Sequence, residues 1–231
     1  MKKNLITTAI LVTIMALAGC VSSTSGPKGD VSALSRVAVV SFTVSDWGGS
    51  VKGGSIGTTP VAELISNAAG KMLIDTEDKL NSKWKVAKVS SFINSPKYHE
   101  LSSEKTLSVF VPKINDKEMA VFTQVSKEIK RGTIAPQTAM DLCKALGVDG
   151  IVTVFSEWTA KTGGFIPMTK AVTKNVVTIW DSNGRQVTKK RVDMMGKKPL
   201  GFSGFKAVNE NTINEWRDSF NRAMDKIISS I

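Results

Sequence analysis

Apolar residues fall in short runs along the chain, and several runs alternate with polar residues at every second position. A short apolar run bounded by turn-forming residues is typical of a buried strand, and alternation is typical of a strand with one buried face. The clearest run is Val-Ala-Val-Val-Ser-Phe at 37–42. Together the runs predict five strands, over 37–42, 84–89, 148–158, 170–180 and 185–192.

Between the predicted strands, apolar residues recur every three or four positions, which predicts amphipathic helices. Thr59 fits the N-cap of the first helix, and Pro60 fits its first helical position. Gly147 follows another of these segments and is typical of a helix C-terminal stop. The predicted helices cover 60–80, 116–130, 136–146 and 213–227.

The order of these elements predicts the fold class. It reads strand, glycine-rich loop, helix, strand, insert, helix, strand, hairpin and helix. The hairpin connection, 181–184, contains Asn183-Gly184, a pair that favours a type I′ turn. The sequence therefore predicts an α/β fold, with a mixed sheet of about five strands and helices packed against it.

Composition divides the chain into three parts. Residues 1–19 have the character of a signal peptide, and residues 20–35 are rich in Ser, Gly and Pro, which predicts a flexible tether. Residues 36–231 are expected to form a single α/β domain, in which 91–133 is a charged insert.

The N-terminal part ends in Leu17-Ala18-Gly19-Cys20, after two lysines and a mainly apolar stretch over 5–18. That tetrapeptide resembles the lipobox of bacterial lipoproteins. The resemblance implies cleavage before Cys20 and attachment of lipid to its thiol, so that the chain is held on a membrane. Val21, rather than Asp, implies the outer membrane by analogy with enterobacterial sorting, with the domain facing the periplasm. The alternative is an ordinary signal peptide with a chance cysteine at the cleavage site.

Charge and cysteine content bound the possible partners. The formal net charge is +11, which suggests an anionic envelope polymer, lipid headgroups or acidic proteins, although solubility alone could account for it. Nucleic acid is not an expected partner in this compartment.

Only Cys143 remains after acylation of Cys20, so no intramolecular disulfide is possible. Its helical context predicts a buried, inert thiol rather than a reactive one.

The element order resembles a group of periplasmic domains: the TolB N-terminal domain, the curli-secretion lipoprotein and the lipoprotein activators of peptidoglycan synthases. The residues that carry this resemblance are 37–42, 145–154 and the Asn183-Gly184 turn. It implies a TolB N-terminal-like fold and a role in oligomeric assembly, secretion or synthase activation. Two features depart from this group. Curli-type lipoproteins build a pore from long hairpins, whereas 161–169 and 193–208 are short and basic here, which argues against a pore. Synthase activators carry a long tether, whereas the tether here is short, which argues against that role.

Catalytic chemistry has little support. Gly53 to Gly57 matches the G-x-S-x-G pattern around Ser55, but that pattern requires a strand directly before it. In the hydrolase order the histidine comes last, after an acid, whereas the only histidine here, His99, lies in a polar segment in the first half of the chain. A serine hydrolase is therefore the least favoured hypothesis, and we expect no enzyme, no cofactor and no metal site.

A basic stretch carries the candidate binding residues. Residues 161–198 hold nine basic and two acidic side chains, which could dock an anionic surface or protect a sheet edge from unwanted pairing. Two further candidates belong to the glycine-rich loop region over 46–59: Trp47, beside the glycines, as a contact residue or a packed loop anchor, and Lys52, together with the loop amides, as an anion ligand. The full candidate set is Trp47, Lys52, Arg185, Lys189, Lys190 and Arg191.

The function predicted from the sequence is a non-enzymatic, membrane-anchored module that binds a protein or an anionic envelope polymer. The alternatives are an oligomeric assembly or secretion component of the outer membrane, which would form homo-oligomers, and a peptidoglycan-synthase activator.

Overall fold

The computed structural model describes residues 23–25, 30–46, 60–103, 109–202 and 208–231. Its main sheet is mixed, with strand order β1-β8-β7-β6-β2-β3, and this confirms the predicted α/β class. β2 is parallel to both β3 and β6, while β6, β7 and β8 are antiparallel. The strands are β1 Ser23–Ser25, β2 Arg36–Asp46, β3 Lys85–Ala87, β6 Gly150–Gly163, β7 Met168–Asp181 and β8 Gln186–Phe202.

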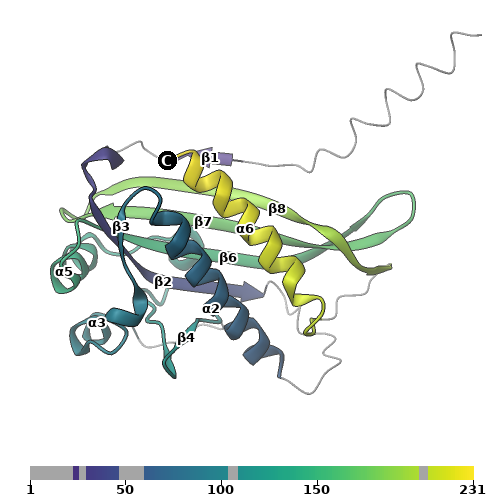
Figure 1. The fold of residues 1–231 in the computed structure, drawn as a ribbon, viewed down its shortest axis with the longest axis horizontal. Coiled ribbons are helices and arrows are strands. Elements are labelled where there is room, and N and C mark those ends of the chain that lie inside the picture. Colours follow the sequence, from purple (N-terminus) through teal and green to yellow (C-terminus); the bar gives the residue numbers. More distant parts are fainter. Residues whose placement is uncertain (1–22, 26–29, 47–59, 104–108, 203–207) are drawn as a thin grey trace, which may run out of the picture.

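Two long helices cover one face of this sheet (Figure 1). α2 (Val61–Leu80) packs on β2 and β3, and α6 (Ile213–Ser229) packs on β7, β8 and α2. Their apolar stripes, predicted from helical periodicity, form the core with the sheet. None of the helices in the described part of the chain combines the length and apolar character needed to cross a bilayer.

A chain of buried polar side chains joins the sheet to α6. The Asn175 carboxamide accepts a hydrogen bond from Ser156 (2.7 Å) and donates to Thr173 and to the Val192 carbonyl, both at 3.0 Å. Thr173 in turn is hydrogen-bonded to Ser219 of α6 at 3.0 Å. These groups lie in a low-dielectric interior, where satisfied hydrogen bonds fix the position of α6 on the strands.

The segment predicted as a charged insert packs against the sheet. The Tyr98 hydroxyl donates to the Val40 carbonyl (2.6 Å) and accepts from the Ala120 amide (3.0 Å). Val40 is the bulged residue of β2, where the register with β6 shifts. The elements of the segment are 3-10 helix η5 Val89–Ser91, α3 Pro96–Glu100, β4 Lys113–Ile114, β5 Lys117–Glu118 and α4 Ser126–Arg131.

The predicted helix over 116–130 is wrong except at its end. Asn115 and Asp116 adopt positive φ angles of 50° and 63°, and they form the two-residue turn between β4 and β5. The following residues, 119–122, are not helical and are buried in the core. Burial of this stretch in a non-helical conformation outweighs its helical spacing, and only α4 is helical.

The hairpin prediction at 181–184 is right in position and wrong in turn type. A type I′ turn needs positive φ at both central residues. Among the described residues other than glycine, only Asn115 and Asp116 have positive φ, so Asn183 does not. The Asp181 carboxylate accepts hydrogen bonds from the Asn183 and Arg185 amides instead, both at 2.9 Å, and Gly184 takes the left-handed conformation.

Three residues of the N-terminal segment, within the predicted tether over 20–35, lie in the main sheet. Ser23–Ser25 form β1, which pairs antiparallel with Lys190 to Val192 of β8. This short strand covers part of the outer edge of β8. The 3-10 helix η2 (Val31–Ala33) then leads into β2.

The predicted helix over 136–146 is confirmed as α5 (Pro136–Leu146). Gly147 ends it with φ of 61°, the left-handed conformation expected at a helix stop. α5 carries Cys143, which is buried as predicted. Burial, and then the nearby carboxylates of Asp181 and Asp149, raise the pKa of this thiol to about 11, so it stays protonated at neutral pH.

Candidate functional site

Four of the predicted site residues lie in the described part of the chain, and the structure separates them into three places. Cys20, Trp47 and Lys52 lie outside the described residues. Lys189 and Arg191 share the sheet face opposite α2 and α6. Lys190 pairs with Val177 and therefore faces the helix side, because successive residues of a strand point to opposite faces.

Arg185 belongs to the β7–β8 turn and has a structural partner there. Its guanidinium contacts the Asp181 carboxylate at 2.7 and 2.8 Å. Burial alone would raise the pKa of Asp181, but hydrogen bonds from Arg185 and Asn183 hold it below its usual value. Arg185 therefore stabilises the turn and is remote from Lys189 along β8.

The sheet face with Lys189 and Arg191 is only partly covered. α4 sits over it, because Thr153 donates to the Gly132 carbonyl (3.0 Å) and Thr178 to the Arg131 carbonyl (3.3 Å). Gly132 is required there, since a Cβ at this position would lie 2.6 Å from the Thr178 hydroxyl. We call this surface the open face; it comprises Lys130, Arg131, Phe155, Glu157, Lys174, Val176, Lys189, Arg191 and Asp193.

A groove of about 300 Å³ runs along the open face. Its floor is apolar, since Phe155 and Val176 lie side by side on β6 and β7 and are each about 95% buried. Its walls are ionic. Lys174 is 2.5 Å from the Glu157 carboxylate, and Arg191 makes two hydrogen bonds of 3.0 Å to Asp193.

Two cations at the end of this groove have no carboxylate partner in the described part of the chain. They are Lys189 and Arg131. Partial burial, and then the Arg131 guanidinium, lower the pKa of Lys189. An anion bound between the two side chains would relieve their mutual repulsion, so this end of the open face is electrostatically suited to an anionic group.

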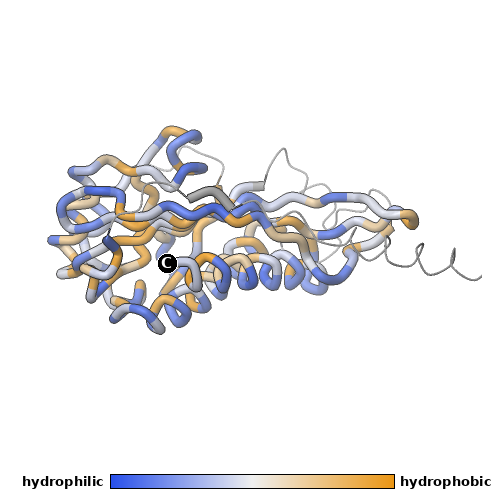
Figure 2. The backbone as a smooth tube through the Cα atoms, turned by 90° about the horizontal axis from the view of Figure 1, so that it is seen from above, coloured by the Kyte–Doolittle hydropathy of each residue, from blue (hydrophilic) through white to orange (hydrophobic). Residues whose placement is uncertain are grey.

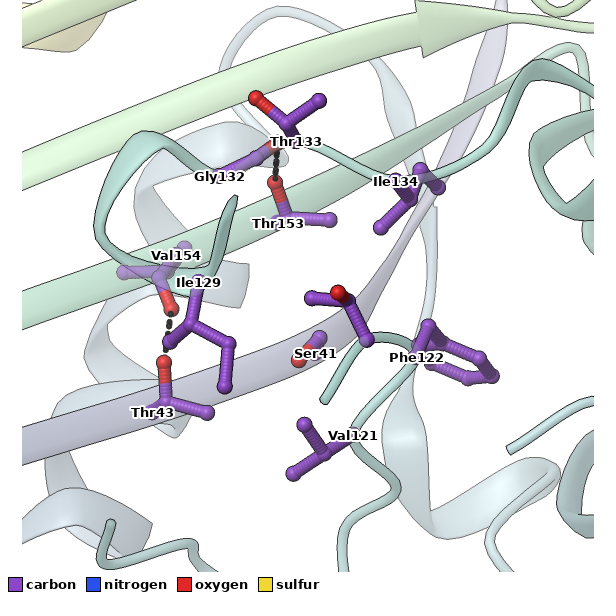
Figure 3. A pocket seen from close by; sticks show the side chains of 11 residues that line it. Ser41, Thr43, Val121, Phe122, Ile129, Gly132, Thr133, Ile134, Thr153 and Val154 are labelled. Carbon is purple, nitrogen blue, oxygen red and sulfur yellow. Dashed lines mark hydrogen bonds between the residues drawn. The ribbon is translucent and has the colours of Figure 1, made fainter. Parts of the chain in front are cut away.

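A second hollow between β2, β6 and residues 121–134 is too small for a ligand (Figure 3). Its volume is about 20 Å³, which suits one water molecule. The hydroxyls of Ser41, Thr43 and Thr153 line it, and Thr153 is committed to the Gly132 carbonyl. The hollow is therefore a packing feature beneath α4.

The described residues add no catalytic cluster. The His99 ring nitrogen Nε2 is 2.6 Å from the Ile93 carbonyl, and its ring packs edge-on against Tyr98. Ser55 lies outside the described residues. The described residues contain no group of three or more His, Cys, Asp or Glu side chains that could hold a metal. The absence of enzymatic activity stays a prediction.

Sequence reasoning found two residues of the open face and missed the others. Lys174 belongs to the basic stretch, but its position opposite Glu157 follows only from the β6–β7 register. Lys130 and Arg131 lie in the segment whose helix was placed wrongly. They reach the open face through contacts with strands more than twenty residues away, which local periodicity does not encode.

No protein-family model matches the chain, and neither does any curated protein. Among solved structures, it is similar to the PelC dodecamer from Paraburkholderia phytofirmans, with 14% identity, a TM-score of 0.39, and coverage of 92% of this chain and 98% of PelC. It is also similar to lipoprotein GNA1162 from Neisseria meningitidis, with 11% identity, a TM-score of 0.41, and coverage of 86% and 99%. A hypothetical protein from Chlamydia trachomatis gives 13% identity and a TM-score of 0.40, with coverage of 86% and 95%. Likenesses at these values assign neither a family nor a function, and the resemblance to the TolB N-terminal group stays a prediction.

Proposed function

We propose that this chain is a lipid-anchored, non-enzymatic envelope module that binds an anionic polymer on its open face. The observation that carries the proposal is the pair Lys189 and Arg131, two neighbouring cations without a carboxylate partner in the described structure. The groove beside them continues the site along an apolar floor. A chain with repeated anionic groups could place one group at the cation pair and extend along the groove.

The lipid anchor would contribute the second part of this function, which is to hold the binding domain at the membrane. Lipid on Cys20 would confine the domain to a thin layer at the outer membrane, facing the periplasm. Confinement raises the effective concentration of a module for any ligand in the same layer. A modest affinity of the open face would then suffice for stable association.

The anchor is tested by metabolic labelling with radioactive palmitate. We expect label on the processed full-length protein and none on a Cys20→Ser variant, because the thiol is the attachment point. Labelled protein should sediment with the outer membrane. Absence of label from the wild-type chain, or a freely soluble product, would contradict the anchor.

Polymer binding is tested with the detergent-solubilised lipoprotein, using polyphosphate and polyglutamate as probes and uncharged dextran as a negative control. The variant Lys189→Gln/Arg131→Gln removes two charges without breaking any ion pair of the described structure. We expect it to bind both polyanions about tenfold more weakly, a change of about 1.4 kcal/mol. Wild-type binding should also weaken as salt rises, since screening acts on exposed charges.

The matched control is Lys190→Gln/Lys226→Gln. It removes the same two positive charges as the test variant, but from outside the open face: Lys190 faces the helix side of the sheet and Lys226 is exposed on α6. Its affinity should stay close to that of the wild type. Equal losses in the two variants would mean that net charge alone drives binding, and the open face would not be the site. The sequence-derived alternatives, an oligomeric secretion component and a synthase activator, remain hypotheses.

A further inference from the structure

The strands β6, β7 and β8 extend beyond the helices as a three-stranded arm, formed by residues 161–170 and 199–202 (Figures 1 and 2). The start of α6 marks where the covered sheet ends, because the Glu215 carboxylate accepts a hydrogen bond from the Lys198 amide at 3.0 Å. Beyond that point the pairing continues to Gly163 opposite Met168, and Met168 opposite Phe202. The three strands are therefore longer than the predicted strands, which ended at Trp158, began at Lys170 and ended at Val192.

The tip of the arm is apolar and exposed. Phe165 and Ile166 lie in its turn, and Phe202 lies beside it on β8; their relative exposures are 106%, 56% and 71%. They are three of the six large hydrophobic side chains found exposed in the described residues. Figure 2 shows a hydrophobic end at the tip, next to hydrophilic and intermediate stretches of the arm. Apolar side chains gathered at a protruding tip are typical of a contact site.

Lysines lie on the arm behind this tip and at the base of the arm. Lys161 and Lys170 lie directly opposite each other on β6 and β7, an unfavourable arrangement for like charges. Lys197 and Lys198 are exposed on β8. None of the four has a carboxylate partner in the described part of the chain. A second copy of the chain would bring four more cations to the same place, whereas a surface of anionic headgroups would complement them.

The direction of β1 brings the N-terminal segment to the same edge. β1 is antiparallel to β8, with Ser23 opposite Val192, so its N-terminal end is the end nearer the arm. Three residues of chain separate Cys20 from Ser23, a contour length of about 11 Å at most. From Val192 to Phe202 the strand rises about 33 Å. The β8 edge between them carries Lys197 and Lys198.

We infer that the arm docks on the anionic membrane that holds the lipid anchor, with Phe165, Ile166 and Phe202 inserted into its interfacial layer. Apolar side chains enter the boundary between headgroups and acyl chains, and the four lysines contact the headgroups. The anchor and the tip then hold the β8 edge against the bilayer at two points. This inference rests on the lipid anchor of the proposed function and is independent of polymer binding.

The test places a fluorophore at the tip. In the Phe165→Cys lipoprotein, an environment-sensitive dye can be attached selectively, because Cys143 is buried with a raised pKa and lipid blocks Cys20. The protein is reconstituted into vesicles of phosphatidylglycerol and phosphatidylcholine. We expect a blue shift of the dye emission, and strong quenching when nitroxide-labelled lipids are included.

Two variants control the measurement. A dye at Ser182→Cys, exposed in the turn at the other end of β7 and β8, should keep a water-like, unquenched emission. In the Phe165→Cys/Ile166→Ser/Phe202→Ser chain, the blue shift and quenching should largely disappear, because only the dye itself remains apolar.

The outcomes separate this inference from the proposed function. Failure of the protein to float with vesicles would contradict the lipid anchor. Flotation with a water-like emission at position 165 would overturn the inference alone. A blue shift without quenching by lipid nitroxides would mean that protein covers the tip, and would also overturn it.

Discussion

Replacement of Asn175 by alanine is expected to lower the free energy of unfolding by about 3–5 kcal/mol, because the truncation leaves several buried hydrogen-bonding groups without a partner. Asn175 is fully buried, and its carboxamide oxygen accepts a hydrogen bond while its carboxamide nitrogen donates hydrogen bonds. Its loss would orphan the Ser156 hydroxyl and the Val192 carbonyl, and would remove a donor from Thr173. Each such group costs about 1–3 kcal/mol when left unsatisfied in the interior.

Urea unfolding of wild-type and variant lipoproteins in the same detergent, followed by tryptophan fluorescence, measures this loss. Asn214→Ala is the matched control, since Asn214 is exposed on α6, and we expect a change within about 0.5 kcal/mol. A loss below about 1 kcal/mol in the Asn175 variant would show that the polar chain contributes little to holding α6 on the sheet.

The hydrogen-bonded chain around Asn175 could not be predicted from the sequence, although the strand that carries it could. Along 170–176, polar residues occupy both faces of β7: Lys170 and Lys174 on one, Thr173 and Asn175 on the other. Alternation alone does not say which polar face meets a helix. That depends on where α6 packs, and α6 comes from a segment more than thirty residues downstream.

Elements specified by local pattern were predicted well. α2 and α5 lie where helical periodicity placed them, and Gly147 ends α5 with the expected left-handed φ. These features depend on neighbours within four residues of one another. β6, β7 and β8 were located correctly but predicted too short, because they continue into the arm through residues without a regular alternation of apolar and polar positions. β3 (Lys85–Ala87) is instead shorter than the predicted strand over 84–89.

Elements specified by distant contacts were predicted poorly. Residues 116–130 have a helix-like spacing, but the sheet and α3 bury part of them in a non-helical conformation. The residues of the open face divide in the same way, into those predicted from local sequence and those placed by distant contacts. Lys189 and Arg191 were found from local charge, whereas Arg131 reaches Lys189 only because Gly132 rests on Thr153 and Thr178. Lys190 lies on the opposite face of the sheet from Lys189 and Arg191. Strand alternation predicts this placement once the face that the helices cover is known.

Replacement of Tyr98 by phenylalanine is expected to destabilise the fold by about 2–4 kcal/mol, although it removes a single oxygen atom. The hydroxyl is the partner of two buried backbone groups, the Val40 carbonyl and the Ala120 amide. Val40 is the bulged residue of β2, and a bulge leaves backbone groups outside the regular ladder. The hydroxyl therefore joins the sheet to the 91–133 segment by pairing with one backbone group of each, the Val40 carbonyl and the Ala120 amide.

The comparison variant is Ser91→Ala, which removes an exposed hydroxyl from a local contact with the Lys88 carbonyl. Its unfolding free energy should stay within about 0.5 kcal/mol of the wild-type value. Urea unfolding distinguishes the two variants. A Tyr98→Phe loss as small as the Ser91→Ala loss would mean that the 91–133 segment is held by apolar packing alone.

The same hydroxyl makes the fold sensitive to alkaline pH, and the chain's single tyrosine allows this to be measured by absorbance. Burial raises the pKa of Tyr98 far above its usual value, and the hydrogen bond from Ala120 offsets this only in part. A raised folded-state pKa contributes stability that is complete below the unfolded-state pKa of about 10 and is lost as pH rises from there toward the folded-state value. Tyrosinate absorbance should therefore increase only together with loss of the native tryptophan signal. Ionisation near pH 10 in a chain that keeps its native fluorescence would show that Tyr98 is accessible to solvent and does not hold the bulge of β2 to the 91–133 segment.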